Sequence, residues 1–132
     1  MTVHNDGTGR AHWLALLTPA LLLAGAYIGQ YAFGLPPCEM CWWQRYPHFA
    51  ALALAVIALF VRSKALIALA ALAIAASGFI GGFHAGVEYG WWKGLTACTS
   101  NAFGAGGDPL AAILAAPVVR CDVAPWTLFG VS

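Results

Sequence analysis

Charged side chains are the scarcest class in this 132-residue sequence: they make up 8% of it, against about 25% in an ordinary soluble domain. Apolar residues make up 61%. A soluble protein of this size would need far more polar surface, so the composition indicates that the chain is solvated by lipid. The net charge is +1 and no basic patch is present, so nucleic acid is not an expected partner.

Three long stretches contain no Asp, Glu, Lys or Arg at all. The hydrocarbon core of a bilayer is ~30 Å thick, and a helix needs ~20 apolar residues to cross it. An isolated strand would leave its backbone polar groups unpaired in lipid, so these stretches are expected to be helices. They predict membrane spans at about residues 14–33, 46–61 and 65–83.

The first stretch also has features of a signal peptide, because Arg10 precedes a Leu-rich run and small residues follow at positions 24–26. The apolar run continues beyond this possible cleavage site, however, and two more spans follow it. We therefore expect the stretch to remain as a span. The chain is then expected to form one membrane domain over residues 1–132.

A Gly-rich segment at residues 84–125 follows the third span and predicts a long surface loop. Inside it, Asp108 and Pro109 are a typical helix start. Residues 110–116 predict a short helix that either lies on the membrane surface or packs within the loop. Residues 126–132 begin a further apolar segment. The expected fold class is thus an all-α transmembrane bundle with three full spans and the start of a fourth.

The four cysteines all fall on one side of the membrane in this arrangement, opposite the short turn that carries Arg62 and Lys64. Positive charge in such a turn favours the cytoplasmic side. Disulfides persist in oxidising compartments such as the bacterial periplasm, and many Tyr and Trp residues gather on the cysteine side as an interfacial belt would. We therefore expect these thiols to face the periplasm: Cys38, Cys41, Cys98 and Cys121.

A C-x-x-C pair, Cys38 and Cys41, indicates redox chemistry. One cysteine of such a pair can attack a substrate while the other resolves the mixed disulfide. Zinc is the alternative, but it takes four ligands in structural sites, and Cys98 and Cys121 lie far apart with no second C-x-x-C. We therefore favour redox cycling, and no metal is expected.

Arg45 follows Cys41 by four residues, which places both side chains on one face if the segment is helical. A fixed cation beside a cysteine favours the thiolate, the reactive form. Arg45 can equally anchor the span at the lipid headgroups. Pro47 leaves two arrangements open: the second helix begins near this proline, or the helix contains it and is kinked there.

Cys98 and Cys121 are spaced for a loop-closing disulfide, which is either a structural staple or a pair that a flexible loop carries to a soluble partner. His84 and Glu88 are four residues apart at the end of the third span. They are either an ordinary interfacial pair or, since polar residues this close to a bilayer are often functional, part of a site.

The motifs together resemble one known family. Residues 38–47 (CEMCWWQRYP) resemble the signature of the bacterial disulfide bond formation protein B (DsbB) family. Residues 84–88 followed by 96–98 are similar to that family's approach to its second periplasmic loop. Residues 120–122 and 125–130 resemble the entry into its last helix. The resemblance covers most of the chain.

The resemblance implies a four-helix bundle in the bacterial inner membrane, with both termini in the cytoplasm and the cysteine loops facing the periplasm. It implies that Cys38–Cys41 is oxidised by a bound quinone, either ubiquinone or menaquinone. The pair Cys98–Cys121 would oxidise DsbA, a periplasmic dithiol carrier with a thioredoxin fold. The implied function is a membrane oxidoreductase that serves protein folding in the periplasm.

The resemblance also implies the residues at the quinone. Arg45 matches the family arginine near the quinone, and His84 and Gln44 are looser candidates for cofactor binding. Family members carry a complete fourth helix, so this chain is expected to stop inside that helix, at Ser132.

Two other functions remain open from the residues. One is a non-catalytic membrane scaffold in which disulfides only staple the loops. The other is an enzyme of the vitamin K epoxide reductase type, which runs similar chemistry on a helical bundle; the context of Gln44 and Arg45 and the spacing of Cys98 and Cys121 disfavour it.

Overall fold

The part of the chain that the structure describes contains three helices. The computed structural model describes residues 7–61, 63–95, 119–127 and 129–130, and no strand occurs among them. The helices are α1 (Gly7–Ala32), α2 (Glu39–Val61) and α3 (Lys64–Glu88). Each is long and apolar enough to cross a membrane, which confirms the prediction of an all-α membrane protein.

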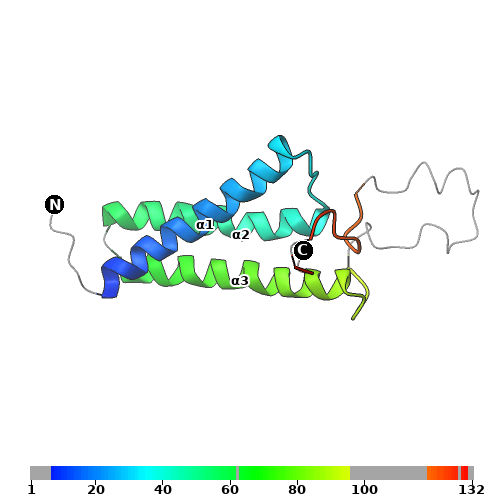
Figure 1. Ribbon diagram of the computed structural model, residues 1–132. Helices are drawn as coiled ribbons and strands as arrows, with labels where there is room; N and C mark the ends of the chain where they lie inside the picture. Colours follow the sequence, from blue (N-terminus) through cyan, green and yellow to red (C-terminus); the bar gives the residue numbers. More distant parts are fainter. Residues whose placement is uncertain (1–6, 62, 96–118, 128, 131–132) are drawn as a thin grey trace, which may run out of the picture.

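Helices α2 and α3 lie side by side along most of their length, and α1 crosses them obliquely (Figure 1). The core between the helices is built from alanines: Ala15 of α1, Ala51 and Ala55 of α2, and Ala70 of α3. Small side chains let helix backbones approach closely, which is how helices associate where lipid removes the hydrophobic driving force. Close backbone packing at these alanines therefore holds the bundle together, with partly buried Leu and Ile side chains packed around them.

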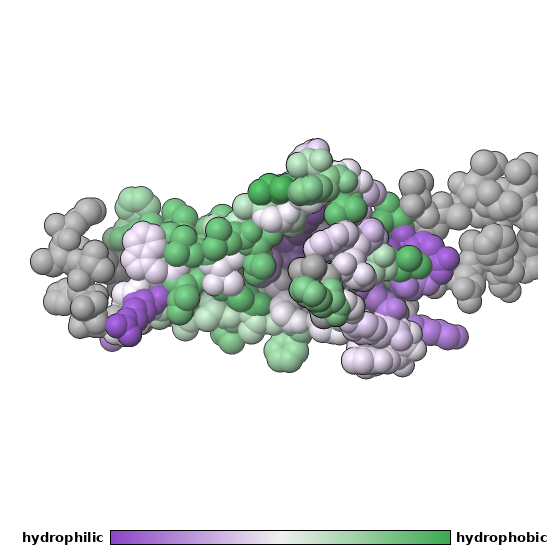
Figure 2. Space-filling view, viewed as in Figure 1, coloured by the Kyte–Doolittle hydropathy of each residue, from purple (hydrophilic) through white to green (hydrophobic). Residues whose placement is uncertain are grey.

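The outer surface of the bundle is apolar over most of its length (Figure 2). Large hydrophobic side chains point outward, as Phe60 and Phe79 do with 83% and 81% of their surfaces exposed. Such a surface in water would be an extended aggregation patch, whereas in a bilayer it is the lipid contact. The hydrophilic side chains gather near the two ends of the bundle.

Helix α2 begins earlier than the apolar run predicts, at Glu39 instead of about residue 46. Pro47 lies inside the helix, which settles the alternative that the sequence left open. The apolar run underestimates the length of α2 because the first two turns of the helix are amphipathic. The earlier start carries Cys41, Gln44 and Arg45 on the helix itself.

Helix α3 also continues beyond the predicted span, so residues 84–88, expected at the start of a loop, are helical. It ends in a Schellman motif: Gly90 has a φ of 72°, its N–H donates to the carbonyl of Val87 at 3.1 Å, and the N–H of Trp91 donates to Gly86 at 2.8 Å. Glycine adopts this left-handed conformation without steric cost. The motif holds the last turn of α3, which carries His84.

The C-terminal residues that the structure describes are not helical. Residues 126 and 127 belong to no helix or strand, residues 129 and 130 form a turn, and Phe129 and Gly130 have positive φ values of 52° and 81°. Left-handed backbone is incompatible with a right-handed helix. The expected start of a fourth helix at 126–132 is therefore not seen in these residues, and the short helix expected at 110–116 lies outside the described residues.

The packing of Gly86 against Trp92 offers a test of this end of the bundle. A methyl group on Gly86 would collide with the indole of Trp92, which stacks on Phe83 at 5.6 Å and donates to its carbonyl at 2.9 Å. We expect Gly86→Ala to displace the indole and to destabilise the protein by about 1–3 kcal/mol, measured as a lower thermal midpoint in detergent. Gly78→Ala is the matched control, because nothing lies within 4 Å of the added group. Equal midpoints for the two variants would contradict this packing.

Candidate active site

The C-x-x-C pair lies at the first turn of α2. Pro36 and Pro37 precede it and prevent the helix from extending further back, since proline lacks the N–H that a preceding turn would use. Cys38 occupies the N-cap position: its carbonyl accepts from the N–H of Trp42 at 3.3 Å, and its sulfur accepts from the N–H of Cys41 at 3.3 Å. The cap thus holds both sulfur atoms at the end of the bundle.

The two sulfur atoms of this pair are in contact. Cys38 Sγ donates to Cys41 Sγ at 3.0 Å. The hydrogen bond with Cys41, together with burial, raises the pKa of the Cys38 thiol well above its usual range. Cys38 is 5% exposed whereas Cys41 is half-buried. The pair is therefore asymmetric, with a protonated, shielded sulfur at Cys38 and an accepting sulfur at Cys41.

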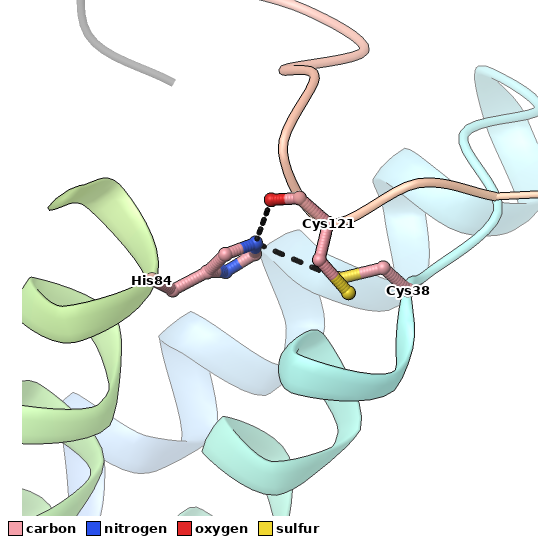
Figure 3. A group of neighbouring side chains, drawn as sticks. All are labelled: Cys38, His84 and Cys121. Atoms are coloured by element: carbon pink, nitrogen blue, oxygen red, sulfur yellow. Dashed lines mark hydrogen bonds between the residues drawn. The ribbon is translucent and has the colours of Figure 1, made fainter. Parts of the chain in front are cut away.

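The described segment at residues 119–127 brings a third cysteine to the same place. Cys121 is fully buried and packs with Cys38, Met40 and Val87 in one apolar cluster. Figure 3 shows the Cys121 side chain directed toward Cys38, with His84 of α3 beside both. Two cysteines that are distant in sequence thus share one water-poor site.

His84 joins this site from α3. Its Nε2 atom lies 3.6 Å from Cys38 Sγ and 3.1 Å from the carbonyl oxygen of Cys121. Its Nδ1 atom lies 2.9 Å from Nε2 of Gln44. With the Gln44 amide donating, Nδ1 is the accepting nitrogen and Nε2 carries the proton that faces the cysteines. Glu88, one turn further along α3, lies 3.5 Å from the same Nε2.

Arg45 lies one turn after Cys41 on α2, and its side chain contacts α1. It is 6% exposed, and its guanidinium donates to Gln30 Oε1 at 2.7 Å and to the carbonyl of Ala26 at 3.4 Å. The same group lies 4.9 Å from the ring centroids of both Tyr27 and Trp42, a cation–π arrangement. Arg45 is thus held inside the bundle by α1, which argues against a role as a headgroup anchor.

A second polar pair lies one turn deeper in the bundle, and sequence reasoning missed it. Ser77 of α3 donates to the carbonyl of Gln44 at 2.8 Å, and its hydroxyl lies 3.1 Å from Nε2 of His48. The signal that could have found this pair is a histidine within an apolar span, since ionisable residues in a membrane are costly and usually functional.

Comparison with known proteins places this arrangement in a family. The family described as "Disulfide bond formation protein DsbB" matches residues 9–132, nearly the whole chain. The chain belongs to the DsbB family. An uncharacterized protein of Rickettsia prowazekii (strain Madrid E) is 30% identical over 90 residues, which cover 66% of this chain and 52% of that relative. The aligned part therefore spans about half of the relative's length. No solved structure matches the chain at a significant level.

Membership of the DsbB family confirms the resemblance that the motifs predict. The chain is a helical membrane protein of the family whose description names disulfide bond formation. The three helices and their apolar surface agree with this assignment.

The site residues predicted from the sequence divide into three groups in this DsbB-family structure. Five of them meet in one site at the N-terminal end of α2 and the C-terminal end of α3: Cys38, Cys41, Cys121, His84 and Gln44. Arg45 faces α1 from the same stretch of α2. Cys98 lies outside the described residues, so its pairing with Cys121 stays a prediction.

Proposed function

We propose that this DsbB-family protein reoxidises a periplasmic DsbA-like dithiol carrier of the thioredoxin fold and passes the electrons to a membrane quinone. The observation that carries the proposal is the contact of three cysteines at the end of the bundle where α2 begins and α3 ends. Cys121, from the loop segment, lies beside the C-x-x-C pair of α2. This juxtaposition joins a loop that a soluble protein can reach to a pair that a lipid-soluble acceptor can reach.

The proximity of Cys38 and Cys121 supports exchange between two cysteine pairs. In this exchange the Cys121 thiolate attacks the Cys38 sulfur of an oxidised Cys38–Cys41 pair. The Cys38–Cys121 bond forms, the Cys38–Cys41 bond breaks, and the electron pair leaves on Cys41. The Nε2 proton of His84 faces the reacting sulfur atoms, so His84 can hold a proton near the sulfur that carries negative charge.

The residues around α2 fit a bound quinone. A quinone carries two carbonyl oxygens that accept hydrogen bonds, and it supplies the acceptor for two electrons when bound. Arg45 is a buried cationic donor beside two aromatic rings. His48 has a buried Nδ1 atom with no hydrogen-bond partner in the part of the chain that the structure describes. Arg45 and His48 would hold the quinone, and Gln44 would orient His84 behind it.

The same arrangement supports a proposal for the orientation of the site in the membrane. Cys38 and Cys41 lie at the N-terminal end of α2, at the opposite end from the turn that joins α2 to α3. We propose that the cysteine end faces the periplasm, in the bacterial inner membrane. A membrane-impermeant maleimide applied to intact spheroplasts is expected to label the reduced cysteines. Labelling only after the membrane is opened would contradict this orientation.

The direct test of the function uses the full chain, purified in detergent or nanodiscs. We expect it to oxidise a reduced thioredoxin-fold dithiol protein and to reduce ubiquinone or menaquinone. One quinone should be reduced for each dithiol oxidised, since each dithiol yields two electrons. The loss of quinone absorbance measures quinone reduction, and titration of free thiols measures oxidation of the dithiol protein. A folded preparation that reduces no quinone, and whose disulfides resist mild reductant, would instead indicate a stapled scaffold.

A further inference from the structure

Three buried side chains of the site also form a set of soft metal ligands. Cys38, His84 and Cys121 each offer one ligand atom, and these atoms all lie within 4.8 Å of one another (Figure 3). We propose that the protein, when these cysteines are reduced, binds one thiophilic divalent cation such as Zn²⁺ at these three side chains. The proposal rests on the thiol form of the cysteines that the proposed function uses, but it requires neither a quinone nor a carrier.

One ligand-atom separation in the site matches that of a tetrahedral zinc centre. Zinc binds thiolate sulfur at about 2.3 Å and imidazole nitrogen at about 2.0–2.1 Å, so the two ligand atoms lie about 3.6 Å apart in a tetrahedron. Cys38 Sγ and His84 Nε2 are already 3.6 Å apart. Because all three side chains are buried, the protein holds them in place before the ion arrives.

Cys41 is the nearest candidate for the fourth position. Its sulfur lies 3.0 Å from that of Cys38, so a small rotation about its side-chain bonds would bring it to the ion. Structural zinc sites close with four protein ligands, commonly two to four of them cysteine and the rest histidine. We therefore expect a Cys₃His centre, or a Cys₂His centre with one water where Cys41 stays outside.

Gln44 has to change its hydrogen bond when the ion binds. In the structure the Gln44 amide nitrogen faces Nδ1 of His84, so the proton sits on Nε2. A metal takes the Nε2 lone pair, which moves the proton to Nδ1, and the amide then turns to accept it through Oε1. This rotation of the Gln44 amide breaks only its long hydrogen bond of 3.4 Å to the carbonyl of Met40. A ligating histidine is commonly held by such an outer hydrogen bond.

The charge balance of the site favours a dication. Binding releases one proton from each coordinating thiol, and two thiolates neutralise the ion. Glu88 adds a nearby carboxylate: Oε1 lies 3.5 Å from His84 Nε2, and its buried Oε2 has no hydrogen-bond partner among the described residues. The metal and the disulfide then compete for the same sulfur atoms, so the loaded protein cannot exchange disulfides until the ion leaves.

Cobalt is the probe for the test, because Co²⁺ reports its own ligands. The full chain is reduced in detergent without oxygen, the reductant is removed, and Co²⁺ is titrated. We expect one ion per chain, with thiolate-to-cobalt charge-transfer absorption and the intense visible bands of tetrahedral Co²⁺. Zn²⁺ should abolish these bands and should protect Cys38 from maleimide. A folded, reduced protein that shows no such bands would overturn the proposal.

Variants identify the ligands. Cys121→Ser and His84→Gln are expected to abolish the tetrahedral spectrum, whereas Cys98→Ser and His12→Gln, the matched controls, should leave it unchanged. Gln44→Leu should weaken the affinity ~10- to 100-fold, and Gln44→Glu should restore it, since a carboxylate also accepts from Nδ1. A spectrum that survives Cys121→Ser or His84→Gln, or that disappears in Cys98→Ser, would overturn the assigned ligand set.

The proposal of a metal site and the proposed function can be refuted independently of each other. Quinone reduction by the metal-free protein measures the function without the metal. Cobalt titration of the reduced protein without quinone measures the site without the function. We expect Zn²⁺ to stop carrier oxidation in the wild type and a chelator to restore it fully; activity that is indifferent to bound Zn²⁺ would contradict coordination by these cysteines.

Discussion

A Cys121→Ser variant is expected to lose oxidation of the dithiol carrier altogether, while its Cys38–Cys41 pair is still oxidised by quinone. The serine hydroxyl fits the space of the thiol but cannot form a disulfide, and Cys121 is the loop cysteine that packs directly against Cys38. Carrier turnover should fall to the rate without protein. Single-turnover oxidation of Cys38–Cys41 by quinone should remain close to wild type.

Cys41→Ser is the companion variant, and it is expected to lose both activities, because Cys38 then has no partner in its own pair. Circular dichroism of both variants in detergent checks that the three helices remain. Carrier oxidation at the wild-type rate in Cys121→Ser would remove the buried sulfur from the route. The separation of the two activities, rather than their loss alone, is what tests the exchange between pairs.

An Arg45→Ala variant is expected to slow reoxidation of Cys38–Cys41 by quinone ~10²- to 10³-fold, the range found when one preorganised donor is removed from a site where charge develops. Arg45 is buried beside two aromatic rings, so water cannot readily take over its stabilisation of negative charge in the variant. The measurement is the rate of quinone reduction by the reduced protein at several quinone concentrations.

Arg45 also joins α1 to α2, so the loss of stability must be separated from the loss of rate. Its hydrogen bonds to Gln30 and to the carbonyl of Ala26 cross between the helices. Arg45→Lys retains the charge without the planar fork and should recover part of the rate but little of the stability. Arg10→Ala removes an exposed arginine of α1 and is the control. A rate unchanged in Arg45→Ala would exclude Arg45 from the electron transfer.

The apolar runs predict the three spans because the bilayer restricts the choice of structure. Over about 20 residues without charge, only a helix satisfies its own backbone, so composition and length suffice. The helix ends are harder to predict, since hydropathy stops at the membrane boundary while hydrogen bonding continues. Helix α2 therefore starts at Glu39, and α3 continues to Glu88.

The cysteine motif and its neighbours predict the family and the class of chemistry. The C-x-x-C spacing follows from what one helical turn can bring together, so Cys38 and Cys41 are recognisable locally. The relation of Cys121 to this pair is not recognisable in the same way. The spacing and the family resemblance both indicate Cys98 as the partner of Cys121, whereas the structure places the Cys121 side chain beside Cys38.

The sequence by itself determined that this protein lies in a membrane, that its spans are helices, and that it carries a C-x-x-C pair, because each of these follows from composition or from contacts within one turn. Only the tertiary structure decided that His84, Gln44 and Cys121 meet at Cys38, and that Arg45 turns toward α1. Those contacts join residues from different helices and from the segment at residues 119–127. Their geometry depends on how the alanine-lined faces of the helices pack, and no local pattern of residues encodes that packing.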